Sequence, residues 1–182
     1  MSVLLHSCCA PCSAAILEWM LNNDIEPVVF FYNPNIFPRE EYEHRKDEIV
    51  RHCEHLGVQY LDGDYDHSRW LAQCAHLAYA PERGERCSLC FRMRLLKAAQ
   101  VAKEHGIERF ATTLASSRWK NIEQVNQAGK WAEQQVEGVT FWANNWRKGG
   151  LQQRRQELLK QYCFYNQLYC GCEFSIRHQS NS

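Results

Sequence analysis

Residues 6–12 read His-Ser-Cys-Cys-Ala-Pro-Cys and join a short apolar run to a segment with a helical pattern. Pro11 suits the first turn of that helix, where its missing N–H costs nothing. A helix N-terminus offers free N–H groups and the positive end of the helix dipole, which favour thiolate over thiol. We therefore expect Cys8, Cys9 and Cys12 to be anionic, close together and directed at one point, as in a metal or redox site.

Short apolar runs alternate with longer helical patterns along the chain of 182 residues. This alternation predicts an α/β fold, with a parallel sheet of about five strands and helices on both faces. We expect one domain over residues 1–176 and a polar C-terminal tail over residues 177–182. The expected strands are 2–6, 26–32, 58–61, 108–112 and 139–142, and the expected helices are 12–22, 39–56, 67–79, 87–105, 120–136 and 151–163.

Ligands of such a sheet bind beyond the carboxyl ends of its strands, where the three cysteines lie. Asp64 and Asp66 follow the third expected strand and lie on the same rim. A carboxylate there could ligate a hard metal ion or move a proton. Asp66 could equally be the N-cap of the helix that follows it.

Cys87 and Cys90 open another expected helix, and their spacing places both sulfurs on one helix face. Together with the first three cysteines, they supply enough thiolates for a tetrahedral zinc site or an iron–sulfur cluster. Cys9-Ala-Pro-Cys12 taken alone also fits a thioredoxin-type dithiol. The spacing leaves all three interpretations open.

The remaining cysteines divide into two kinds. A disulfide between Cys170 and Cys172 would close a small, strained and easily reduced ring, which favours redox cycling, with metal ligation as the alternative. Cys53, Cys74 and Cys163 lie inside helical patterns and are expected in the core. For His6, at the end of a strand, a core histidine with satisfied hydrogen bonds is the default expectation.

The net charge is zero, but its distribution is uneven. Residues 1–66 contain 4 Lys/Arg and 12 Asp/Glu, whereas residues 67–182 contain 17 and 9. The excess of basic residues in the second part, Arg147 and Arg154 among them, favours an anionic partner, although solvated helix faces explain it equally well. Trp142, Trp146 and Tyr162 lie among these residues and suit stacking on unpaired bases, or else core packing.

The chain has no apolar stretch of membrane-spanning length and no signal-peptide pattern at its N-terminus. We therefore expect a cytoplasmic protein, in which thiols stay reduced. Ten cysteines in that compartment favour metal or redox chemistry over a disulfide framework.

Five motifs together resemble the QueH family of cobalamin-independent epoxyqueuosine reductases, over about residues 3–176. The resemblance implies a Rossmann-like fold related to the nucleotide α-hydrolase (HUP-like) group. It also implies two-electron removal of the epoxide oxygen of epoxyqueuosine, at the wobble position of tRNA with a GUN anticodon, to give queuosine. The motifs are His6-x-Cys8-Cys9-Ala10-Pro11-Cys12, Tyr32-Asn-Pro-Asn-Ile36-x-Pro38, Glu41-Tyr42, Cys87-x-x-Cys90-Phe91 with Arg94-Leu95, and Tyr169-Cys-Gly-Cys172 with Phe174-Ser175.

The resemblance also implies roles for individual residues. Cys170 and Cys172 would form a redox-active pair, and Cys12 and Asp66 would hold an additional iron ion, with Asp66 also catalytic. A ferredoxin or flavodoxin would donate electrons. The chain departs from the family pattern in two places: Ser117-Arg118-Trp119 replaces Ser-Pro-Tyr, and Asn166 replaces a basic residue. The implied ligands of a [4Fe–4S] cluster are Cys8, Cys9, Cys87 and Cys90.

Two other functions remain compatible with the residues alone. One is a thiol–disulfide oxidoreductase that uses Cys9 and Cys12. The other is an RNA-binding module stabilised by zinc.

Overall fold

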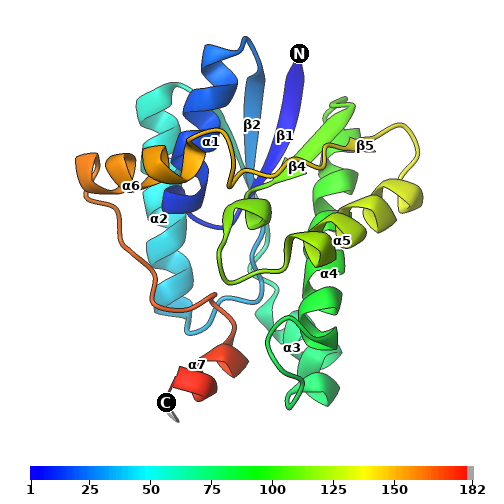
Figure 1. Ribbon diagram of the computed structural model, residues 1–182. Helices are drawn as coiled ribbons and strands as arrows, with labels where there is room; N and C mark the ends of the chain where they lie inside the picture. Colours follow the sequence, from blue (N-terminus) through cyan, green and yellow to red (C-terminus); the bar gives the residue numbers. More distant parts are fainter. Residues whose placement is uncertain (180–182) are drawn as a thin grey trace.

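A parallel sheet of five strands forms the centre of the molecule, in the order β3-β2-β1-β4-β5 (Figure 1). The computed structural model describes residues 1–179, with side chains described to residue 176. The sheet confirms the predicted α/β fold. Its strands are β1 (Ser2–Ser7), β2 (Glu26–Phe31), β3 (Gln59–Asp62), β4 (Arg109–Thr112) and β5 (Thr140–Phe141).

Helices cover both faces of the sheet. The first face carries α1 (Ala10–Asn22), α2 (Arg39–Leu56) and α6 (Leu151–Gln161), and the second carries α4 (Glu85–Glu104) and α5 (Ile122–Gln135). Two shorter helices, α3 (His67–Cys74) and α7 (Glu173–Gln179), lie beyond the carboxyl ends of the strands. In the part of the chain that the structure describes, no helix combines the length and the apolar character that crossing a membrane requires.

The predicted elements agree with the structure apart from their ends and three short segments. The helix expected at 67–79 is α3 followed by a 3-10 turn, Ala75–Leu77, and a second 3-10 turn, Thr113–Ser116, was not predicted. Helix α7 was also missed, and it includes the first residues of the predicted tail. Residues 180–182 lie outside the described residues, so the division of the chain at residue 176 stays a prediction.

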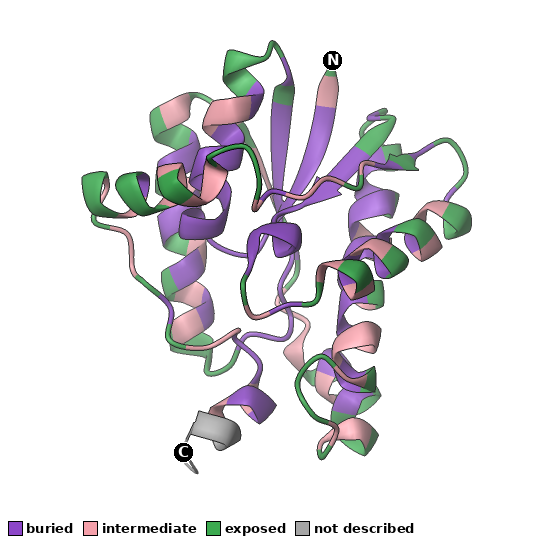
Figure 2. Cartoon of the chain, viewed as in Figure 1, coloured by how far each residue is buried: buried purple, intermediate pink, exposed green. Residues whose placement is uncertain are grey.

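Strand β1 is the centre of the core. Val3, Leu4 and Leu5 are fully buried, because a central parallel strand is covered on both faces. Leu4 pairs with Val28 of β2 on one side and with Phe110 of β4 on the other. Buried residues continue from the strands into α1 and the 3-10 turn after β4 (Figure 2).

The strand order creates a crevice at the end of β1. The chain proceeds from β1 to β2 on one side, whereas β4 lies on the other side. Such a reversal of strand order opens a ligand-binding crevice beyond the carboxyl ends of the two central strands. The segment that leaves β1 at this point is the one with three cysteines.

Helix α5 packs closely on the sheet at Gly129. A Cβ at this position would lie 2.3 Å from Cε1 of Phe141, whose ring is itself packed against Phe110. Alanine in a helix gains roughly 0.5–1 kcal/mol over glycine, but overpacking a core costs about 1–3 kcal/mol. We therefore expect Gly129→Ala to lower the free energy of unfolding by about 1 kcal/mol or more, as measured by urea denaturation. Gln127→Ala, on the exposed side of α5, should leave the urea midpoint nearly unchanged, and an equal effect of both changes would contradict the packing argument.

Candidate metal and redox centre

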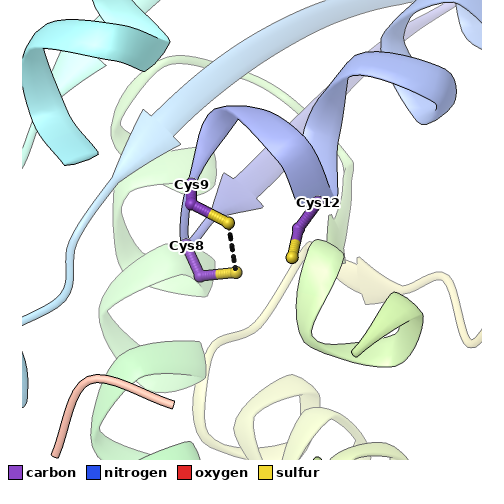
Figure 3. Close-up of side chains that lie close together, drawn as sticks. All are labelled: Cys8, Cys9 and Cys12. Atoms are coloured by element: carbon purple, nitrogen blue, oxygen red, sulfur yellow. Dashed lines mark hydrogen bonds between the residues drawn. The ribbon is translucent and has the colours of Figure 1, made fainter. Parts of the chain in front are cut away.

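The loop between β1 and α1 brings three sulfur atoms together. Cys9 is the N-cap of α1 with an extended backbone, and Pro11 follows in the first turn as predicted. The Sγ atoms of Cys8, Cys9 and Cys12 all lie within 4.8 Å of one another, with 3.8 Å between the first two (Figure 3). All three residues are buried, so the trio forms a closed group of soft ligands.

The three thiols do not ionise alike. Hydrogen bonds from the Cys12 and Cys9 thiols hold the pKa of Cys8 well below its usual value. Burial raises the pKa of Cys9, and the hydrogen bond to Cys8 raises the pKa of Cys12 to about 11. Without metal, one shared negative charge is therefore favoured, and the expectation of three thiolates is wrong for that state. A bound cation would be needed to remove the other protons.

The 3-10 turn after β4 supports this trio from the neighbouring strand. The backbone N–H of Cys8 donates to Thr113 Oγ1 at 3.1 Å, and the Thr113 hydroxyl lies 3.4 Å from Cys8 Sγ. Ser13, one turn into α1, donates its hydroxyl to the carbonyl of Cys9 at 2.7 Å. The peptide groups that carry the sulfurs are thus fixed from two sides.

His6 is the core histidine that was expected by default. Its Nδ1 lies 2.9 Å from Thr112 Oγ1, and its Nε2 lies 2.9 Å from the carbonyl oxygen of Tyr32. Since only a protonated nitrogen can bond a carbonyl, Nε2 donates and Nδ1 accepts. Burial lowers the pKa of His6 to about 3, so its ring is neutral.

Cys87 and Cys90 lie in the first turns of α4 and line a cavity at the same end of the sheet. Cys170 and Cys172 line it as well. Lys120 joins this cavity to the trio, because it lines the cavity and its charge also lowers the pKa of Cys8. The cavity is lined by Asn35, Trp70, Glu82, Arg83, Arg86, Cys87, Cys90, Phe91, Arg94, Trp119, Lys120, Cys170 and Cys172.

A second link between the two cysteine groups passes through Asn33 and Arg94. Asn33 donates its side-chain amide to the carbonyl of Ser7 at 2.9 Å and accepts from Arg94 Nη2 at 2.5 Å. The other terminal nitrogen of Arg94 lies 4.0 Å from Cys90 Sγ. The end of β1 and the start of α4 are therefore joined through two buried side chains.

The walls of this cavity carry positive charge, and some of their buried hydrogen-bond donors have no partner. Arg86, Arg94 and Lys120 are all buried. Among the described side chains, buried atoms without a hydrogen-bond partner include three donors on this wall: Trp70 Nε1, Arg86 Nε and Arg94 Nε. Buried donors and cations of this kind favour an anionic group with several acceptor atoms.

The loop with Cys170 and Cys172 is held by backbone and charged contacts. Phe37 N donates to the carbonyl of Gly171 at 2.9 Å, and Ile36 forms an antiparallel bridge with Cys172. Arg45 donates to the carbonyls of Tyr169 and Cys170 at 3.1 and 3.3 Å. The same guanidinium, nearly buried, pairs with Glu41 at 2.8 Å.

Asp66 lies apart from the sulfur trio. It occupies the N-cap position of α3 without a side-chain capping bond, and its carboxylate lies 3.7 Å from Arg69. It lines a different cavity, of about 400 Å³, together with Asp64. Within the described residues, the compact group of possible metal ligands contains Cys8, Cys9 and Cys12 but not Asp66, Cys87 or Cys90. The shared iron site and the cluster site with four cysteines therefore stay predictions.

The structure corrects one expectation about the core, for Cys163, and decides between two alternatives for Trp146. Cys53 and Cys74 are buried as expected, but Cys163 is exposed, because α6 ends at Gln161 and Cys163 lies in a turn with a φ of 53°. Trp146 is only 1% exposed, and its ring centroid lies 5.8 Å from that of Trp19. Its role is therefore core packing and not stacking on a base.

Arg147 and Arg154 are occupied by contacts within the chain. Arg154 forms two bonds with the carboxylate of Glu18, at 2.7 and 2.9 Å. Arg147 donates to the carbonyls of Ser117 and Lys120. Both guanidinium groups therefore have hydrogen-bond or ion-pair partners within the chain.

Sequence reasoning missed Arg45, Asn33 and Lys120 as parts of the site. Asn33 and Arg94 stand inside motifs that the family resemblance quoted, which was the available signal. Arg45 had no such signal, since a basic residue in an amphipathic helix is usually solvated.

The fold and the gathered cysteines define an α/β protein with a thiol-based metal or redox centre. The family model described as epoxyqueuosine reductase QueH matches residues 3–178. The chain therefore belongs to the QueH family of epoxyqueuosine reductases and is an oxidoreductase by family, which confirms the family predicted from its motifs.

Relatives with the same description come from several bacteria. The Haemophilus influenzae protein is 45% identical over 175 residues, covering 96% of this chain and 71% of its own. The Histophilus somni protein is 46% identical, covering 96% and 72%. The Thermotoga maritima protein is 35% identical, covering 96% and 90%.

A solved structure shares the fold at much lower identity. It is the U34-tRNA thiolase NcsA from Methanococcus maripaludis with its [4Fe-4S] cluster, 13% identical with a TM-score of 0.57. The match covers 95% of this chain and 61% of the thiolase chain. It supports the Rossmann-like architecture.

The buried neutral His6 predicts a specific dependence of stability on pH. Its pKa is about 3 in the folded chain against 6.5 when unfolded, so its stabilising effect is complete above pH 6.5 and is lost as the pH falls towards 3. In metal-free protein, His6→Gln should reduce the slope of unfolding free energy against pH between pH 6 and 4 by about 1.4 kcal/mol per unit. Urea denaturation at several pH values measures this slope. His76→Gln, at an exposed position, should keep the wild-type slope; an unchanged slope in His6→Gln would contradict the assignment.

Proposed function

We propose that this chain reduces epoxyqueuosine to queuosine in tRNA, with a [4Fe–4S] cluster held by Cys8, Cys9, Cys87 and Cys90. Its family supports the reaction. The observation that carries the cofactor assignment is the buried cysteine trio, which Asn33 and Arg94 connect to the cationic cavity lined by Cys87 and Cys90. The related fold of a thiolase that holds a [4Fe-4S] cluster agrees with this assignment.

The residues around the site fit an anionic cluster. Four thiolates give the cluster a net negative charge, which the buried cations Arg86, Arg94 and Lys120 would balance. The unpartnered N–H groups of Trp70 and Arg94 are suited to donate to cluster or cysteine sulfurs. When bound, the cluster would supply electrons singly and a Lewis-acidic iron for the epoxide oxygen.

Cys170 and Cys172 supply the two-electron chemistry in this proposal. Conversion of an epoxide to an alkene and water consumes two electrons and two protons, and closing one disulfide from two thiols releases the same numbers. An external reductant of the ferredoxin or flavodoxin class would reopen the disulfide. Arg45 would keep the loop in place by its bonds to the two carbonyls that precede Gly171.

We retain Cys12 as the candidate ligand for an additional iron ion, because its sulfur belongs to the trio. Asp66 would need α3 to approach the trio before it could share that ion or act as a catalytic acid. The substrate is tRNA with a GUN anticodon, whose loop presents the wobble base unpaired.

An anaerobic preparation tests the cofactor. We expect broad absorption near ~400 nm with measurable iron and sulfide. Cys8→Ser and Cys87→Ser should each abolish most of that absorption, since each removes a ligand. Cys163→Ser, an exposed cysteine away from the site, should keep it. A colourless protein with one tightly held zinc would instead support the RNA-binding module, and a metal-free protein that reduces model disulfides would support the Cys9/Cys12 oxidoreductase.

The dithiol is tested with the cluster in place. Cys170→Ser and Cys172→Ser should keep the absorption and the iron content, because neither residue is a proposed cluster ligand. Both variants should lose the single turnover that reduced wild-type enzyme performs without external reductant, as followed by mass spectrometry of the modified nucleoside. Multiple turnovers by Cys170→Ser with a strong chemical reductant would confine the pair to electron delivery, and single turnover without reductant would remove its role.

A further inference from the structure

A cavity of about 250 Å³ opens beside Cys12, and we call it the Cys12 chamber. Trp119 lines both this chamber and the cavity that contains Cys87 and Cys90. The chamber is therefore next to the proposed redox centre and shares Cys12 with it. Its lining residues are Cys12, Ser116, Ser117, Arg118, Trp119, Gln152, Arg155, Gln156 and Asn166.

The lining of the chamber is cationic and contains no carboxylate. Arg155 is half-buried and lines the chamber together with Cys12. The guanidinium of Arg118 lies 5.3 Å from the centroid of the half-buried Trp119 ring. An aromatic ring beside cations is the combination that stacks a base and contacts its phosphate.

The wall that carries Trp119 is fixed by side chains from three other segments. Arg83 donates to the carbonyls of Arg118 and Trp119 at 3.1 and 3.2 Å. Arg147 donates to the carbonyl of Lys120 at 2.7 Å, and Gln152 donates to that of Ser116 at 2.9 Å. The chamber is thus preformed, which reduces the entropy cost of binding.

We propose that the Cys12 chamber binds the wobble nucleotide of tRNA, with Trp119 stacked on the base and Arg155 and Arg118 in contact with its phosphates. This assignment rests on the proposed function, which requires that base to reach the redox centre. The chamber is too small for paired RNA and can admit only a single nucleotide. The wobble base must therefore leave the stack of its loop to enter it. The lack of a carboxylate in the lining also suits a phosphate and disfavours a cationic ligand.

Two adjacent arginines on α6 provide a matched test. Arg155 lines the chamber, whereas Arg154 is paired with Glu18 and Glu157. Arg155→Gln should weaken binding of an anticodon stem-loop RNA by about tenfold and reduce the slope of log affinity against log salt by about 1. Arg154→Gln should leave both nearly unchanged. Fluorescence titration of the iron-loaded enzyme measures affinity, and iron content confirms that each variant keeps its metal.

Stacking is tested by pairing a protein change with an RNA change. Wild-type enzyme should bind a stem-loop that lacks the wobble base about tenfold more weakly than the complete one, and Trp119→Ala should abolish that difference. Trp119→Phe keeps an aromatic ring and should restore it. If Trp119 had only a structural role, Trp119→Ala would weaken the binding of both RNAs equally and leave the ratio of their affinities unchanged.

The outcomes separate this proposal from the proposed function. If iron-loaded wild-type enzyme binds neither RNA, the tRNA reductase function itself fails. If it binds the complete RNA, but Arg155→Gln behaves like Arg154→Gln and Trp119→Ala keeps the wild-type ratio, the Cys12 chamber is not the nucleotide site and the reductase function stands.

Discussion

The buried hydrogen bonds of Asn33 and Arg94 hold the centre together. Asn33 binds the last peptide group of β1, and Arg94 connects it to Cys90 on α4. The bond between Arg94 and Asn33 joins residues 61 positions apart in the sequence, so that two short cysteine motifs can serve one site. Removal of either side chain would leave its partner buried and unsatisfied, which is costly because the interior cannot rehydrate it. The fold places both motifs at one end of the sheet, and this pair fixes their mutual position.

Charge balance at the same place explains why cations are buried in a region rich in thiols. Burial opposes the charge of the Arg45 guanidinium, but the negative charge of the cysteine trio and of its partner Glu41 raises its pKa. Without metal, however, the trio favours a single charge, because the thiols share protons through hydrogen bonds. The other thiols lose their protons only when a metal centre binds, and the thiolate charge then matches the buried cations. Metal loading and the rigidity of this region should be coupled for that reason.

Local pattern was enough to predict the layers, the strand positions and the cysteine segments, since alternating apolar runs and turn residues determine them. It could not predict which polar and aromatic side chains have their partners within the molecule. Arg154 looked like a phosphate contact until the fold brought Glu18, from α1, beside it. For Trp146 the sequence left base stacking and core packing open, and the structure packs its ring on Trp19. Both outcomes depend on contacts between distant segments, which periodicity does not contain.

Contacts between distant segments also decide what the uneven charge of the two parts of the chain does. Acidic residues of α2 bind the C-terminal segment: Glu48 accepts from the backbone N–H of Tyr165 at 2.7 Å, and Glu41 accepts from the Tyr165 hydroxyl at 3.1 Å. On α6, Arg154 forms an ion pair with Glu18 of α1, whereas the neighbouring Arg155 lines the Cys12 chamber. Arg155 and Arg118 thus place positive charge beside Cys12. An anionic substrate would be drawn to the position where the thiols lie, so recognition and chemistry share one end of the sheet.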